Sequence, residues 1–122
     1  MESLNLETLL EMQRKLQDKY ASVWEPTNVD TGKNNLLWMV GEIAEVADII
    51  KKNGDHPAVE EPALREHLLE EMSDVLMYYF KVMLCYGIPA GELQEAYLAK
   101  YKRNWTRWEA QLKEASHESA DD

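Results

Sequence analysis

The sequence is poor in cysteine, glycine, proline and basic residues. Its 122 residues include one cysteine, five glycines, four prolines and 13 lysines plus arginines. A single cysteine, Cys85, cannot form an internal disulfide, so we expect a cytoplasmic protein in which this thiol lies in the core. The 23 acidic residues give a net charge of −10, which excludes the concentrated basic surface that a nucleic acid polymer requires.

Long apolar runs are also missing. The longest apolar stretch, residues 75–86, is interrupted by Lys81 and is shorter than the about 20 residues that cross a bilayer. The first residues include Glu2, Glu7 and Glu11 and no basic leader before an apolar run. We therefore expect neither a signal peptide nor a membrane partner.

Helical periodicity fills the stretches between the few breaks. Asn5 is a candidate N-cap, Gly54 and Gly87 are candidate helix ends, and Pro62 suits a first helical turn. Apolar residues nowhere alternate with period two over a useful length, so we expect an all-α protein, an antiparallel four-helix bundle. The expected helices cover residues 6–20, 33–52, 62–86 and 89–112, in a single domain over residues 1–115 followed by a disordered acidic tail over residues 116–122.

Two acidic pairs lie on the core side of their predicted helices. Glu42 and Glu45 are three residues apart on the second helix, and Glu71 and Asp74 are three apart on the third, so each pair shares a helix face. Four partly buried carboxylates cost several kcal/mol each unless cations or protons compensate their charge. Oxygen ligands favour Mg²⁺, with Mn²⁺ as a substitute. The alternative for either pair alone is a solvated surface.

Histidine is absent from both acidic pairs. An oxygen-activating di-iron bundle requires Glu-x-x-His motifs, and neither pair supplies one. We interpret His67, which precedes the second pair, as a partly exposed helix residue.

A polar and basic set follows on the last predicted helix. Lys100, Asn104 and Arg107 are spaced by four and three residues, which places them on one face. A forked guanidinium, an ammonium and an amide donor together suit a polyphosphate. The alternative is a solvated face whose long side chains cover apolar surface.

These motifs occur in the order ExxE, ExxD and KxxxNxxR, the last followed by Trp108. Over residues 33–108 this order resembles the all-α nucleoside triphosphate pyrophosphohydrolases, the group of MazG and dCTP pyrophosphatase. The resemblance implies hydrolysis of a nucleoside triphosphate at its α–β bond to the monophosphate and pyrophosphate. It also implies that the four carboxylates hold Mg²⁺.

The resemblance further implies roles for single residues. Lys100, Asn104 and Arg107 would contact the phosphates, Tyr78 would lie near the sugar or base, and one carboxylate, for which we choose Glu45, would activate the attacking water. The preferred base and sugar stay open.

A noncatalytic helical module that binds nucleotides or a protein is the alternative function. Four tryptophans predict apolar surface that a homodimer or homotetramer would bury.

Overall fold

The computed structural model describes residues 3–121, and its side chains are described through residue 117. Every regular element in that part of the chain is an α-helix, which confirms the expected all-α class; the four-helix bundle stays a prediction. None of these helices is long and apolar enough to cross a membrane. The helices are α1 (Leu6–Lys19), α2 (Val29–Asn53), α3 (Pro57–Glu60), α4 (Pro62–Cys85), α5 (Ala90–Arg107) and α6 (Glu109–Asp121).

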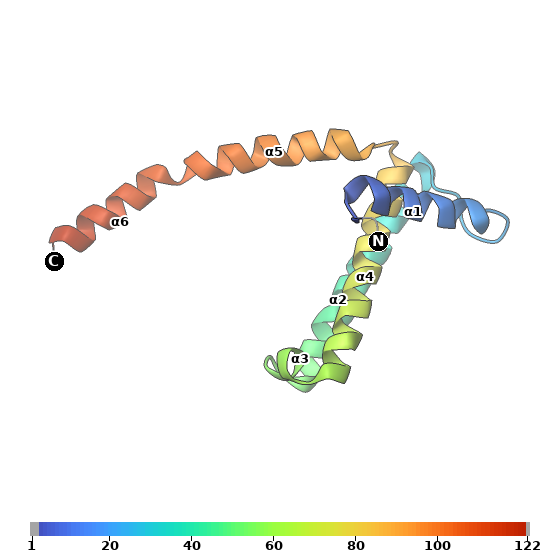
Figure 1. Ribbon diagram of the computed structural model, residues 1–122, viewed down its shortest axis with the longest axis horizontal. Helices are drawn as coiled ribbons and strands as arrows, with labels where there is room; N and C mark the ends of the chain where they lie inside the picture. The colour runs from blue at the N-terminus through green and yellow to red at the C-terminus, as the bar shows by residue number, and fades with distance from the viewer. Residues whose placement is uncertain (1–2, 122) are drawn as a thin grey trace. The chain divides into compact units, whose positions relative to one another are not determined.

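The chain divides into two compact units, Met1–Pro89 and Ala90–Asp122. In the first unit, α2 and α4 pack along each other as an antiparallel hairpin, α3 lies at one end of it, and α1 packs on α4 at the other end (Figure 1). The second unit contains α5 and α6.

The predicted division into a domain over residues 1–115 and a tail over residues 116–122 stays a prediction. The backbone is helical through Asp121, where the sequence analysis expected disorder. Alanine, glutamate and lysine, which have high helix propensity, occur along α6 and favour this conformation. Asp122 lies outside the described residues.

Side-chain caps fix the starts of the first two helices. Asn5 is the N-cap of α1, as predicted, and the structure adds a capping box with Thr8. Asn28 caps α2 in the same way, and the Asn28 backbone N–H donates to Thr31 Oγ1 at 3.1 Å. The second helix therefore begins at Val29, earlier than the predicted start at residue 33, because the capping box continues the helix through a stretch that was interpreted as loop.

Glycines with positive φ angles end two helices, as predicted. Gly54, with a φ of 94°, follows α2, and Gly87, with a φ of 62°, follows α4. The prediction did not include α3, a single turn that begins at Pro57 and is too short to show periodicity. It also expected one helix over residues 89–112, whereas α5 ends at Arg107.

Several buried polar groups are paired with one another in the first unit. Thr31 Oγ1 lies 3.4 Å from Cys85 Sγ, and Asn35 Nδ2 donates to the Thr31 carbonyl at 2.9 Å. On α1, Gln13 Nε2 donates to Gln17 Oε1 at 3.1 Å. We call Thr31, Asn35 and Cys85 the Thr31 cluster. It joins α2 to α4, and it makes Cys85 the buried free thiol that the sequence predicts.

Candidate metal centre

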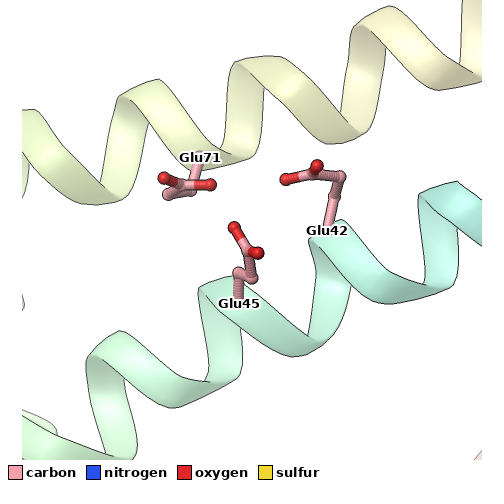
Figure 2. A group of neighbouring side chains, drawn as sticks. All are labelled: Glu42, Glu45 and Glu71. Atoms are coloured by element: carbon pink, nitrogen blue, oxygen red, sulfur yellow. The ribbon is translucent and has the colours of Figure 1, made fainter.

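The two acidic pairs meet where α2 and α4 face each other. One carboxylate oxygen each from Glu42, Glu45 and Glu71 lies within 4.8 Å of the others. Figure 2 shows the three carboxylates pointing toward one another, two from α2 and one from α4. This convergence follows from the helical period, which puts residues three apart on the same face of α2. We call Glu42, Glu45 and Glu71 the carboxylate cluster.

Burial and mutual repulsion destabilise the charged form of this cluster. Glu42 and Glu71 are half-buried, whereas Glu45 is exposed. Burial raises the pKa of Glu42 above its usual value, and the charges of the neighbouring carboxylates raise it further. Burial also raises the pKa of Glu71, the adjacent Glu45 carboxyl adds to the rise, and His67 opposes it. The cluster therefore needs positive charge from elsewhere when its carboxylates ionise.

Asp74, the fourth predicted ligand, lies beside the carboxylate cluster. It is half-buried on α4, and its negative charge adds to the effect of burial on the pKa values of Glu42 and Glu71. Among the described residues, the oxygens that lie within 4.8 Å of one another do not include those of Asp74. The structure thus brings three of the four predicted ligands together, with Asp74 in electrostatic range.

One oxygen of Glu71 shows that the cluster suits a cation. In the described part of the chain, Glu71 Oε2 is buried and has no hydrogen-bond partner. The other oxygen, Oε1, lies 3.5 Å from His67 Nε2. Leaving a buried carboxylate oxygen without a partner is costly, and oxygen donors of this type are the preferred ligands of hard divalent cations. The residues present therefore fit a divalent metal ion.

Comparison with known proteins agrees with this geometry. Residues 30–105 match the MazG nucleotide pyrophosphohydrolase domain. The chain belongs to this family. Similar proteins include dCTP pyrophosphatase 1 of Bos taurus and of Rattus norvegicus, each 29% identical over 117 residues, which are 93% of this chain and 68% and 67% of those proteins. No solved structure matches the chain.

The MazG match contains all four acidic residues and part of the predicted phosphate-binding set. Lys100 and Asn104 lie inside the match, and Arg107 lies just beyond it. All three are exposed on α5, in the second unit. The guanidinium carbon of Arg107 lies 4.8 Å from the centroid of the Trp108 ring. Their contact with phosphate stays a prediction.

A cleft of about 330 Å³ opens beside the carboxylate cluster of this MazG domain. Its walls include Glu45 and Glu71 and also Lys52 and His67, the second of which the sequence analysis did not assign to a site. The overlooked clue to His67 was its spacing, because it precedes Glu71 by four residues on the same helix. The remaining lining residues are Asp48, Ile49 and Asn53.

A second pocket, of about 440 Å³, has aromatic walls and contains Tyr78. Lys81 Nζ lies 4.4 Å from the centroid of the Tyr78 ring and 5.3 Å from that of Trp24. Burial raises the pKa of Tyr78, and the charges of Glu42 and Asp74 raise it further. This pocket is therefore within electrostatic reach of the carboxylates. Its walls also include Gln17, Asn35 and Trp38.

The sequence motifs indicate Tyr78 as a site residue but do not indicate the residues around it. Lys81 was noted only as an interruption of an apolar stretch, and Trp24 was one of the four tryptophans expected to form apolar surface for a homo-oligomer. A cation in the middle of an apolar helix face was the available clue, because burying an ammonium requires a partner such as an aromatic ring.

Proposed function

We propose that this chain is a Mg²⁺-dependent nucleoside triphosphate pyrophosphohydrolase, with Mn²⁺ as a substitute, that removes triphosphates from the nucleotide pool. The observation that supports the proposal most is the convergence of Glu42, Glu45 and Glu71, together with the buried Glu71 Oε2 that has no partner. Membership of the MazG family supports the reaction class, and the names of the similar proteins support a triphosphate substrate. The proposed products are the nucleoside monophosphate and pyrophosphate.

In this proposal Glu42, Glu45, Glu71 and Asp74 hold the metal. A divalent cation held there would supply positive charge that neutralises the phosphate oxygens and favours an in-line attack. Glu45 orients the attacking water and accepts its proton, because it is the exposed member of the carboxylate cluster and lines the adjoining cleft. The water oxygen bonds to the α-phosphorus as the bond to the α–β bridging oxygen breaks, and pyrophosphate leaves.

The substrate-binding residues come from two regions. The aromatic pocket with Tyr78 and Trp24 would receive the base and sugar, because aromatic side chains stack on every nucleobase. On α5, Lys100, Asn104 and Arg107 would contact the phosphates, since they combine two cations with a neutral donor. The similar proteins make dCTP the first substrate to test, with other bases and both sugars in the same panel.

We also infer a homodimer or homotetramer. On α2 and α4, large apolar side chains are exposed, and a shallow apolar groove of about 220 Å³ lies among them. An apolar surface of this kind rarely stays in contact with water, and a second copy of the same chain would cover it. Light scattering would detect the assembly. The groove is lined by Ile43, Val46, Met72 and Val75.

Two further parts of the proposal concern the location of the protein in the cell and the size of its substrate. The single buried cysteine supports a reducing, cytoplasmic location. The net charge of −10 supports a small metal-bound substrate in preference to a nucleic acid polymer.

A panel of ribonucleoside and deoxyribonucleoside triphosphates tests the proposed reaction. Each is incubated with the protein and Mg²⁺, and pyrophosphate and orthophosphate are assayed separately. Pyrophosphate with an equal amount of monophosphate is the expected result, and Glu42→Gln is the inactive control. Release of orthophosphate alone would assign cleavage to another bond. Triphosphate binding without turnover would favour a noncatalytic nucleotide-binding module.

A further inference from the structure

The imidazole of His67 adjoins the carboxylate cluster. It lies one turn before Glu71 on α4, and its Nε2 atom is 3.5 Å from Glu71 Oε1. His67 also lines the cleft that contains Glu45 and Glu71. His67 therefore lines the same cleft as two of the carboxylates that would hold the metal, Glu71 on its own helix and Glu45 on α2.

The spacing of these atoms is close to that of two ligands on one ion. Metal–ligand bonds of about 2.1 Å place neighbouring ligand atoms of an octahedral ion about 3 Å apart. The separation of 3.5 Å between His67 Nε2 and Glu71 Oε1 exceeds this by a small amount. The His67 side chain is 54% exposed, against 18% for Glu71, so the imidazole has room to make the adjustment.

An ion pair between His67 and Glu71 is the competing interpretation. A protonated imidazole would lower the charge of the cluster, and His67 does oppose the rise in the pKa of Glu71. The 3.5 Å contact between the two residues, however, is not one of the hydrogen bonds of the described side chains. The ion pair also leaves Glu71 Oε2 buried without a partner, whereas a cation shared by His67 and the carboxylates would lie among several of these donors.

We propose that His67 is a nitrogen ligand of the divalent cation, which strengthens the binding of Mn²⁺ relative to that of Mg²⁺. The inference rests on the proposed metal site and adds to it a ligand outside the two acidic motifs. Imidazole is a good ligand for first-row transition metals, whereas Mg²⁺ keeps oxygen ligands and several waters. His67 therefore strengthens Mn²⁺ binding and leaves Mg²⁺ binding almost unchanged.

Pulsed electron paramagnetic resonance of bound Mn²⁺ reads this ligand directly. Echo modulation from a coordinated ¹⁴N nucleus is expected in the wild type, and labelling of its histidines with ¹⁵N shifts the modulation frequency. The modulation disappears in His67→Gln and persists in His56→Gln, a matched control at an exposed histidine outside the cleft. The labelling arm needs no variant, so it is independent of any effect of substitution on folding.

Calorimetric titration with each metal salt provides the second measurement. In His67→Gln the affinity for Mn²⁺ should fall about tenfold or more, while the affinity for Mg²⁺ changes by less than about twofold. Bound Mn²⁺ without nitrogen modulation, or modulation that persists in His67→Gln, would overturn the role of His67; pyrophosphate release in the same sample would show that the proposed function still holds. Failure of wild type to bind either metal would overturn both.

Discussion

Two polar clusters lie along the same pair of helices, and they differ in how their polar atoms are satisfied. In the Thr31 cluster, Thr31 Oγ1 donates to the Pro26 carbonyl at 2.7 Å, and Asn35 donates to the Thr31 carbonyl at 2.9 Å. In the carboxylate cluster, groups of like charge face one another. Among the described side chains, Glu71 Oε2 is the one buried nitrogen or oxygen atom that has no partner.

This difference distinguishes buried polar groups that stabilise the fold from buried polar groups that are available to bind a ligand. Paired polar groups stabilise the hairpin without a ligand, because Thr31 and Asn35 on α2 also contact the Cys85 sulfur on α4. Unpaired like charges raise the free energy of the folded protein, so binding a cation there contributes both to stability and to chemistry. We therefore expect substitutions in the two clusters to have opposite effects on stability and activity.

The largest effect is expected from Glu42→Gln or Asp74→Asn. Each removes a carboxylate from the proposed metal site, and loss of several kcal/mol of transition-state stabilisation lowers turnover at least about a hundredfold. Because each change also removes a repelling charge, the melting temperature of the metal-free protein should stay the same or rise. Pyrophosphate assays and circular dichroism melting check both results. Unfolding of both variants, or full activity in either, would contradict the different roles proposed for the two clusters.

The next largest effect is expected from Thr31→Ala in the Thr31 cluster. The substitution removes a buried hydroxyl and one half of the capping box of α2, at a cost of about 1–3 kcal/mol in the free energy of unfolding. Urea denaturation should show this loss while Mg²⁺ binding stays unchanged. Thr8→Ala is the matched control, because Thr8 holds the same position in the exposed capping box of α1 and should cost less. Equal losses in both variants would mean that burial adds nothing at Thr31.

A smaller effect is expected when Mg²⁺ is added to the wild type. A ligand that binds only the folded state at about ten times its Kd stabilises by about 1.4 kcal/mol, which raises the melting temperature by several degrees. A monovalent salt of equal ionic strength should have less effect, because it only screens the net charge. Thr31→Ala should keep the Mg²⁺ increment and Glu42→Gln should lose most of it.

Arg107→Ala distinguishes the metal from the phosphates in the same assay. This variant should keep the Mg²⁺ increment and lose the additional stabilisation that a nonhydrolysable triphosphate gives. An equal Mg²⁺ response in wild type and Glu42→Gln would contradict the metal site.

Much of the first unit follows from sequence patterns because its elements are long and end at strong breaks. The pairs Glu42 with Glu45 and Glu71 with Asp74 were assigned to core-facing stripes from helical periodicity alone, and three of these residues do converge. The start of α2 was placed too late because Asn28 was interpreted as part of a loop. Capping depends on one side chain, which periodicity does not detect.

The residues that the sequence analysis missed depend on contacts between elements. Trp24 and Lys81 meet only because the loop after α1 lies against α4, and their separation along the chain carries no periodic pattern. His67 was interpreted as a partly exposed helix residue, and its side chain is indeed 54% exposed. Its position beside Glu71 follows from helical spacing, but its place in the cleft requires the pairing of α2 with α4.

The smallest effect is expected in the pH dependence of stability without metal. Burial raises the pKa of Glu42 and of Glu71 above the ordinary value of 4.5, so the folded protein holds protons that the unfolded chain has already released. The stability that these two groups contribute to the folded protein is therefore complete below the ordinary pKa of 4.5. It is lost as the pH rises through the raised pKa values. Urea denaturation in the presence of a chelator at about pH 5, 6 and 7 measures how steeply the free energy of unfolding depends on pH.

Glu42→Gln should make this dependence less steep, because one of the two groups no longer titrates. Thr31→Ala should lower the stability by the same amount at each pH, since its side chain carries no titrating group. A Glu42→Gln slope equal to that of the wild type would show that repulsion in the carboxylate cluster does not limit the stability of the fold.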